Sequence, residues 1–277
     1  SSFEAVSSTS LGHKWAKGFR MNWPSLEVID DCMQASGIRL ESNDGQFLRR
    51  VFSGSPERYL RRLKRIGFQN RGLVLDAGCG FGQWTIALAQ LNNRITAFDA
   101  DSTRIQFLNL LLERLGILNV ETYESKLPEI PRTDSFFDGI FCFGTVFLSP
   151  WELSLANFAS SLANGGLLFV NANDIGWHLY LFETGHNETR DYKASESLMH
   201  ALIRTSVYKR GTGTGEEKGQ IIIEKAEFAQ KLDELGLSVI SQGEDGRAVL
   251  NLRSRRFLRT RFFPGTYKGF DAVHEVL

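Results

Sequence analysis

The chain contains few of the residues that build cross-links, metal cages or membrane spans. Only three of its 277 residues are cysteine, and Cys32, Cys79 and Cys142 are far apart in the sequence. This spacing predicts neither a disulfide framework nor a zinc motif. There is no run of about 18 apolar residues and no signal-peptide pattern, so the sequence predicts no membrane span. We therefore expect a cytoplasmic protein.

Neither sign of charge is in excess. Lys+Arg and Asp+Glu both number 32, which gives a formal net charge of zero. Proteins that bind nucleic acid over a whole surface are usually basic, so this balance argues against a nucleic-acid partner. With 42% hydrophobic and 23% charged residues, the composition is that of an ordinary globular protein of one to two domains.

A glycine-rich turn between an apolar segment and a helical pattern is the clearest local feature. Residues 73–75 suit a buried strand, Asp76 follows them, and residues 83–91 have helical periodicity. Three glycines alternate in the turn, at Gly78, Gly80 and Gly82. Without Cβ atoms the turn can adopt positive φ angles and approach a ligand closely. The helix N-terminus behind it offers unpaired N–H groups, so we expect an anionic group to bind there.

The spacing of these glycines indicates which ligand binds. A dinucleotide fingerprint would need a glycine at the position of Gln83, so the third glycine comes one residue early. The pattern hydrophobic-Asp-x-Gly-x-Gly-x-Gly instead resembles motif I of the class I S-adenosylmethionine-dependent methyltransferases. In that family the turn holds the methionine part of the cofactor. A nicotinamide-dependent oxidoreductase is the more distant alternative.

A second acidic residue supports this resemblance. Residues 94–98 are expected to form the next strand, which ends in Asp99, about 20 residues beyond the glycines. A carboxylate at this position can accept hydrogen bonds from both ribose hydroxyls, because it is acceptor-only. Asp101 competes for the role, but its position predicts an N-cap for a helix over 102–115. Asp99 is therefore the predicted ribose ligand.

Strands and helices alternate along the chain, which predicts an α/β fold with a mostly parallel sheet. Beyond the segments already named, the patterns predict strands at 119–123, 136–143, 167–171, 237–241 and 248–252, and helices at 44–71, 151–163 and 225–236, with a Gly-Gly turn at 165–166. Together they resemble the Rossmann-like, seven-stranded methyltransferase sheet, whose final strand pair forms an antiparallel edge. A helical N-terminal extension and a helical insertion after strand 5 are added to that sheet.

The expected division of the chain follows from these segments. Residues 1–70 form an N-terminal helical extension or cap, residues 71–252 form the S-adenosylmethionine-binding domain, and residues 253–277 form a C-terminal extension. The insertion at 172–220 is longer than the core fold needs. Because long insertions in compact domains are usually functional or disordered, we expect this one to be a substrate lid.

The resemblance implies a set of cofactor-binding residues. Glu124 or Ser125, after the third strand, would recognise the adenine amino group. The complete set is Asp76, Gly78, Cys79, Gly80, Gly82, Asp99, Ala100, Glu124, Ser125 and Cys142. S-adenosyl-L-methionine is the expected cofactor.

The residues that assist methyl transfer are less well indicated. Alignment of donor and acceptor can supply most of the catalysis, whereas a hydroxyl acceptor also benefits from a general base. Many small-molecule members of the family carry histidines where this chain has Phe147 and Leu148. We therefore expect the base in the insertion, with His178 as first candidate and Asp174 as second. Too few oxygen ligands cluster to predict a metal site.

Basic residues are concentrated in the predicted helical segment 44–71. They are Arg49, Arg50, Arg58, Arg61, Arg62, Lys64, Arg65 and Arg71. They could attract an anionic substrate such as a phosphorylated or acidic sugar. The alternative is a solvated helix face with no ligand.

The sequence thus predicts an S-adenosylmethionine-dependent methyltransferase that acts on a small molecule or saccharide, with oxygen as the methylated atom. One alternative is methylation of nitrogen on a small molecule or a macromolecule. The other is a cofactor-binding module without catalysis. The acceptor's identity and the oligomeric state do not follow from the sequence.

Overall fold

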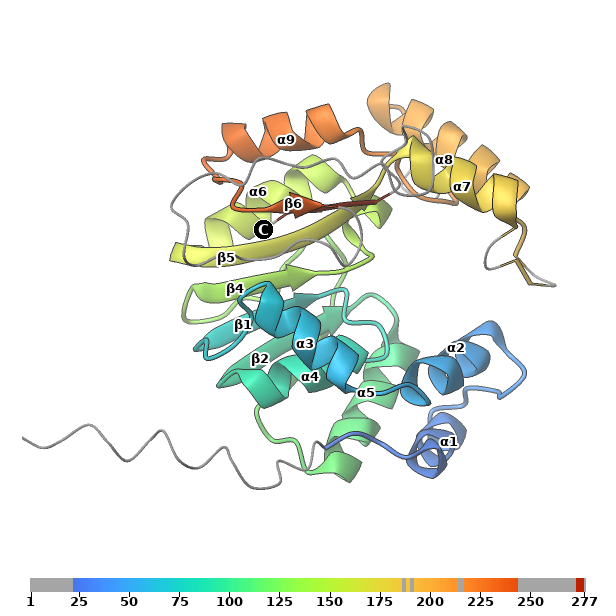
Figure 1. Ribbon diagram of the computed structural model, residues 1–277, viewed down its shortest axis with the longest axis vertical. Helices are drawn as coiled ribbons and strands as arrows, with labels where there is room; N and C mark the ends of the chain where they lie inside the picture. The colour runs from blue at the N-terminus through green and yellow to red at the C-terminus, as the bar shows by residue number, and fades with distance from the viewer. Residues whose placement is uncertain (1–21, 186–187, 190–191, 214–216, 244–272, 277) are drawn as a thin grey trace, which may run out of the picture.

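A central sheet lies between two layers of helices in the computed structural model, which describes residues 22–185, 188–189, 192–213, 217–243 and 273–276 (Figure 1). Over these residues the strand order is β3-β2-β1-β4-β5-β7-β6. The strands are β1 (Leu73–Ala77), β2 (Arg94–Asp99), β3 (Val120–Glu124), β4 (Phe137–Cys142), β5 (Leu162–Asn173), β6 (Gln242–Gly243) and β7 (Val273–Val276). The pairs from β3 to β5 are parallel, and β7 runs antiparallel to β5 and β6. The α/β class and the parallel core predicted from the sequence are confirmed.

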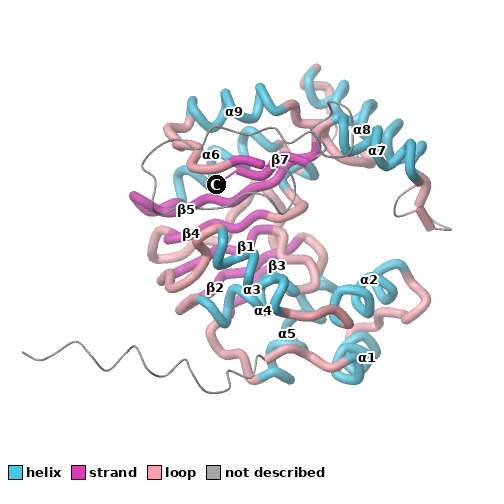
Figure 2. The backbone as a smooth tube through the Cα atoms, viewed as in Figure 1, coloured by secondary structure: helices cyan, strands magenta, loops and turns pink. Residues whose placement is uncertain are grey.

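The helices precede and connect these strands. They are α1 (Leu26–Ala35), α2 (Asn43–Phe52), α3 (Glu57–Arg65), α4 (Gln83–Leu91), α5 (Ser102–Leu115), the 3₁₀ turn η1 (Val146–Leu148), α6 (Trp151–Ser161), α7 (Ile175–Thr184), α8 (Ala194–Lys209) and α9 (Lys225–Glu234). Figure 2 shows α7 and α8 beyond one end of β5, and α6 and α9 together along the sheet. Among the described residues, no helix is both long enough and apolar enough to cross a bilayer.

Alternate strand residues enter different cores, as a pleated sheet requires. In β4, Phe141 packs with residues of α1–α5, whereas Ile140 and Cys142 pack with residues of α6 and α9. In β5, Phe169 belongs to the first cluster and Val170 to the second. Both faces of the parallel core are therefore apolar, which explains why β1 reads as a nearly continuous hydrophobic run.

Two helices begin and end where the sequence predicts. Residues 83–91 form α4, and residues 102–115 form α5. Asp101 caps α5, because its side chain accepts the N–H groups of Thr103 and Arg104. Gly116 ends the same helix with φ of 63°. The predicted capping role of Asp101 is confirmed.

The structure corrects three other segments. The helical pattern at 44–71 is two helices rather than one, because Gly54, Ser55 and Pro56 interrupt it and α3 begins after Pro56. The predicted Gly-Gly turn is a bulge inside β5, since Phe137 pairs with Leu162 but Gly139 pairs with Leu167. Gly165 within it has φ of 75°.

The predicted strand at 237–241 is the third correction. These residues form no strand, and β6 starts just after them. Leu237 and Val239 pack against the core beside α6 and α9, so their apolar alternation reflects burial without strand pairing. The last predicted strand, 248–252, lies outside the described residues. Among the described residues, β6 and β7 form the antiparallel edge of the sheet.

Candidate active site

A pocket of about 1190 Å³ opens at the carboxyl ends of β1, β2 and β4. This is the edge at which open α/β sheets bind ligands. The turn after β1, the end of β2, residues 125–127 after β3 and residues 143–145 after β4 line it. Helix α2 contributes further lining from the N-terminal part of the chain, and Thr189 and Tyr192 contribute from the connection between α7 and α8. Three distant stretches of sequence therefore meet around one cavity.

The three glycines of the turn have different roles. A Cβ on Gly78 would lie 2.3 Å from Oγ1 of Thr145, and a Cβ on Gly82 would lie 2.2 Å from Cδ1 of Leu108. These two glycines are required because neighbouring side chains pack against them. Gly80 has φ of 55°, and a Cβ there would meet no atom within 4 Å. Gly80 therefore keeps pocket space open directly above the turn.

Asp99 connects the end of β2 to the same turn. Its Oδ2 accepts the Gly80 N–H at 2.9 Å, and its Oδ1 accepts the Asp101 N–H at 3.0 Å. The residue is buried but lines the pocket. Because a carboxylate offers about four acceptor positions, two are left for a ligand. A vicinal diol supplies the two O–H donors that such a carboxylate can bind.

Asp76 lies beneath the turn and is 2% exposed. Thr85 donates its hydroxyl hydrogen to Oδ2 of Asp76 at 2.7 Å. Burial raises the pKa of Asp76 to about 7, the Thr85 hydrogen bond opposes this rise, and the charge of Asp99 adds to it. Near neutral pH the ionisation of Asp76 is therefore sensitive to any charged ligand in the pocket.

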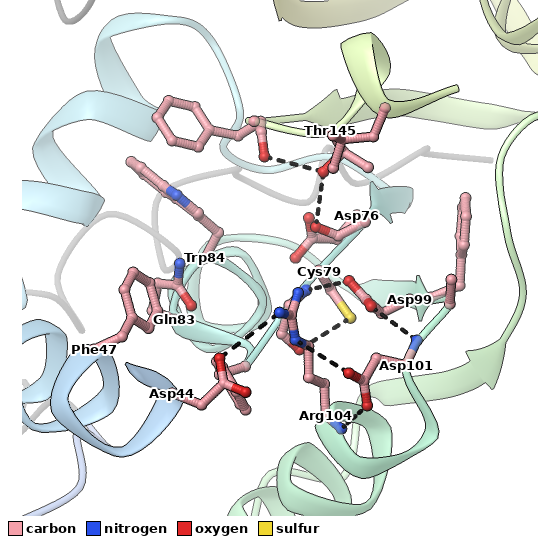
Figure 3. Close-up of a pocket in the computed structure, with 18 of the residues that line it drawn as sticks. Asp44, Phe47, Asp76, Cys79, Gln83, Trp84, Asp99, Asp101, Arg104 and Thr145 are labelled. Atoms are coloured by element: carbon pink, nitrogen blue, oxygen red, sulfur yellow. Dashed lines mark hydrogen bonds and ion pairs between the residues drawn. The ribbon is translucent and has the colours of Figure 1, made fainter. Parts of the chain in front are cut away.

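An ion pair joins α5 to α2 beside the turn. Nη2 of Arg104, in α5, lies 3.8 Å from Oδ1 of Asp44 in α2 (Figure 3). Nε of Arg104 lies 3.7 Å from Oδ2 of Asp101. Its guanidinium also stacks over Phe81 in the turn, 5.1 Å from the ring centroid. Phe47 of α2 packs against the same ring at 6.1 Å. These contacts attach the N-terminal helices to the pocket wall.

Aromatic residues line the side of the pocket away from Asp99. Trp84 and Phe143 pack together with ring centroids 5.2 Å apart. The Arg62 guanidinium lies 4.9 Å from the Phe143 centroid and 5.6 Å from that of Trp84. Figure 3 shows Trp84, Gln83 and Phe47 on one side of Cys79 and Asp99 on the other. Sequence reasoning did not identify Phe47 or Trp84 as pocket residues, because both fit the apolar face of a helix.

Most residues of the predicted cofactor set meet in this pocket. Those that line it are Asp76, Gly78, Cys79, Gly80, Asp99, Ala100 and Ser125. Gly82 does not, because it packs against Leu108. Glu124 is exposed at the end of β3, and Cys142 is fully buried in the core beside α6 and α9.

The two predicted catalytic residues lie outside the pocket lining. Asp174 is the N-cap of α7 and accepts the Gly176 N–H at 3.2 Å. His178 is 1% exposed, and neither ring nitrogen has a hydrogen-bond partner among the described residues. Burial lowers the pKa of His178 to about 4, although the charge of Asp174 opposes this shift. The catalytic role of both residues stays a prediction.

The insertion is attached to the end of β4. Arg204 of α8 donates to the carbonyl oxygens of Leu148, Glu217 and Gly219 at 2.7, 3.0 and 2.6 Å. The Ile221 N–H donates to the Phe147 carbonyl at 2.8 Å. Leu148 also lines the pocket, so the insertion and the pocket share a wall.

Comparison with known proteins identifies the domain. The sequence model of the methyltransferase domain matches residues 74–166, which contain β1 to β4 and the glycine-rich turn. Over these residues the chain is similar to the S-adenosylmethionine-dependent methyltransferases, as the sequence predicts. S-adenosylmethionine is the cofactor of that family.

Individual relatives match parts of the chain. It is 30% identical over 152 residues to an uncharacterized protein of Synechococcus sp., covering 53% of this chain and 34% of that one. It is also 30% identical over 93 residues to ribosomal RNA small subunit methyltransferase G of Clostridium botulinum, covering 33% and 37% respectively. The chain thus spans about a third of the length of these curated relatives.

A solved structure shares the fold over a larger part of the chain. An S-adenosylmethionine-dependent methyltransferase from Clostridium acetobutylicum superimposes with a TM-score of 0.54 at 11% identity. The match covers 80% of this chain and 91% of that one. At this identity the likeness shows the fold alone.

Proposed function

We propose that this pocket binds S-adenosylmethionine and transfers its methyl group to a small-molecule or saccharide acceptor. The position of the Asp99 carboxylate is the main support for this proposal. It is fixed by the Gly80 and Asp101 N–H groups, and its free acceptor positions suit the ribose diol. The open space over Gly80 would take the methionine part, which the N-terminus of α4 and Asp76 adjoin.

The remaining lining marks where an acceptor would enter. The adenine part would extend from Asp99 toward Ala100, Ser125 and Leu127. The acceptor is then left with the surface formed by α2, the aromatic pair Trp84 and Phe143, and the α7–α8 connection. Alignment in this enclosed space supplies the main catalytic effect, because the sulfonium already provides a neutral leaving group.

Calorimetry on two variants tests the cofactor proposal. Wild-type protein should bind S-adenosylmethionine and S-adenosylhomocysteine with micromolar Kd, and should not bind NAD(H). Asp99→Ala removes hydrogen bonds to a charged group, so affinity should fall by about 10-fold or more. Asp233, exposed on α9, provides the control Asp233→Ala, which should bind normally.

A matched pair of glycine variants tests the open space directly. Gly80 and Gly116 have φ of 55° and 63°, and neither would bring an added Cβ within 4 Å of another atom. Alanine should therefore strain both backbones similarly, but only Gly80→Ala places a methyl group where the cofactor is proposed to bind. Equal cofactor affinity in both variants would contradict the proposal.

Oxygen is the atom that we propose to be methylated, as the sequence analysis expects. Nitrogen is the second candidate, and the pocket lining favours it in one respect. No histidine is found in the described lining, and Asp44, the carboxylate contributed by α2, is paired with Arg104. An amine acceptor needs little beyond alignment, whereas a hydroxyl benefits from a base. Product mass spectrometry with matched alcohol and amine acceptors separates the two.

The proposal also assigns the parts of the chain. Residues 1–70 would act as a helical cap, residues 71–252 as the methyltransferase domain, and residues 253–277 as an extension. Of that extension, residues 273–276 are described, and they add β7 to the sheet of the domain. The insertion at 172–220 would form the acceptor-side lid, which Thr189 and Tyr192 support by lining the pocket. We further propose a cytoplasmic location, which the free cysteines Cys32, Cys79 and Cys142 suit.

A further inference from the structure

Four carboxylates and three cations line the described part of the pocket, and they differ in how they are paired. Arg50, Arg104 and Lys126 are its cationic side chains. Arg104 is paired with Asp44 and Asp101, whereas Arg50 and Lys126 have no ion pair with a described acid. Lys126 follows Ser125, on the side assigned to the cofactor's adenine. Arg50 is therefore the cation without an ion pair on the pocket wall that α2 forms.

Arg50 also differs from the other basic residues of its segment. Of the eight cations in the segment 44–71, it is the one that lines the pocket. The preceding residue, Arg49, points elsewhere, since its Nε donates to Asp30 of α1 at 2.9 Å. The Arg50 guanidinium lies 5.6 Å from the centroid of Phe47, which also lines the pocket. An aromatic ring and a cation thus lie side by side at the proposed acceptor surface.

The neighbouring lining residues are aromatic or uncharged. Phe47, Trp84 and Phe143 provide apolar contact, and Gln46 and Gln83 provide amides. Oε1 of Gln83 is buried and has no hydrogen-bond partner among the described residues. A ligand that satisfies this surface would combine an apolar or planar body with an anionic group beside Arg50 and a hydrogen-bond donor for Oε1 of Gln83.

We propose that Arg50 binds a carboxylate or phosphate group of the methyl acceptor, so that this pocket selects small anionic acceptors with an apolar body. This inference rests on the proposed methyltransferase function. The cofactor has a carboxylate of its own, which is the other possible source of the same chemistry. The N-terminus of α4 can receive that group, because Gly82 caps the helix without a side-chain hydrogen bond and its first N–H groups face the turn.

Matched probes test the acceptor side. Benzoate and benzamide have nearly the same shape and differ in charge. Ligand-observed NMR with protein saturated with S-adenosylhomocysteine should show about a tenfold preference for benzoate, as expected for a charge-assisted hydrogen bond. The preference should disappear in Arg50→Gln and persist in the control Arg49→Gln, which removes a neighbouring charge outside the pocket.

A second comparison identifies the source of the anion. S-adenosylhomocysteine carries the amino-acid carboxylate, and 5′-methylthioadenosine lacks it. If Arg50 serves the acceptor, Arg50→Gln should leave the ratio of these two affinities unchanged. A selective loss of S-adenosylhomocysteine binding in Arg50→Gln would assign Arg50 to the cofactor and overturn the proposal.

The remaining outcomes are also decisive. Equal binding of benzoate and benzamide, no binding of either, or a benzoate preference that survives in Arg50→Gln would each overturn the inference while cofactor binding stayed intact. Failure of the wild type to bind S-adenosylhomocysteine would instead overturn the proposed function. The two failures are therefore distinguishable in one set of samples.

Discussion

Thr85 donates its hydroxyl hydrogen to Asp76 at 2.7 Å, beneath a turn that leaves Asp76 almost no contact with water. The pKa of Asp76 rises from its ordinary 3.8 to about 7, chiefly through burial. The folded protein therefore holds a proton that the unfolded chain releases between these two values. This proton connects both stability and cofactor binding to pH.

Titration of Asp76 should make the folded protein less stable as pH rises. Between pH 4 and 7 the folded state binds more protons at Asp76 than the unfolded state, so its contribution decreases as pH rises, by at most about 4 kcal/mol. In Asp76→Asn this decrease should be absent, which urea unfolding at pH 5 and pH 8 can measure. Asp233→Asn is the exposed control. If the free energy of unfolding of Asp76→Asn still fell between pH 5 and pH 8 as in the wild type, another group would be responsible for the decrease.

His178 should change the pH dependence of stability in the opposite direction. Its pKa is lowered from 6.5 to about 4 by burial, so the unfolded chain binds the extra proton between these values. Stability should therefore be lost as pH falls from 6.5 to 4, by about 3 kcal/mol. His178→Phe should remove this loss, whereas His200→Gln on α8 should not. The unfolding transition, followed by circular dichroism at several pH values, measures both.

The same variant tests the catalytic role that the sequence predicted. Because His178 is buried outside the pocket lining, His178→Phe should retain cofactor affinity and methyl transfer within a few-fold of wild type. If His178→Phe folded and bound S-adenosylhomocysteine normally but no longer transferred the methyl group, the predicted role of His178 as a general base would be supported.

Gly82 and Leu108 should be energetically coupled. A Cβ at Gly82 would overlap Cδ1 of Leu108, and φ of 84° adds strain for any L side chain. Gly82→Ala should therefore destabilise the protein by about 2–4 kcal/mol, from overpacking and backbone strain together. In Leu108→Ala the overlapping atom is gone, so the additional cost of Gly82→Ala should be smaller. A double-mutant cycle of unfolding free energies measures this coupling, and strict additivity would contradict it.

The ion pair between Arg104 and Asp44 should contribute little to stability. Its side chains are 37% and 50% exposed, so Asp44→Asn should cost less than about 1 kcal/mol. Its main effect should be on α2, whose amides should exchange hydrogen faster in the variant. Protection in α9, far from the pair, serves as the control. Unchanged exchange in α2 would mean that the apolar contacts of the helix hold it without the ion pair.

The sequence predicted the sheet core well because the relevant signals are local. The Asp76 turn, the Asp101 cap and the Gly116 stop depend on residues that neighbour one another, so their types alone indicate the structure.

What the sequence could not predict depends on distant contacts. Phe47 and Arg50 are ordinary helix residues until α2 packs over the turn, and only the fold brings them to the pocket. His178 was predicted by its position after strand 5, but helical rotation within α7 turns its ring into the core. Cys142 is likewise absent from the described pocket lining, because its side chain is fully buried in the core beside α6 and α9.

Arg204 has a mechanical consequence beyond local hydrogen bonding. One guanidinium binds the carbonyl oxygens of Leu148, Glu217 and Gly219 and so rigidly joins α8, the segment after it and the turn that follows β4. Because Leu148 also lines the pocket, a displacement of α8 would be expected to move this part of the pocket wall with it.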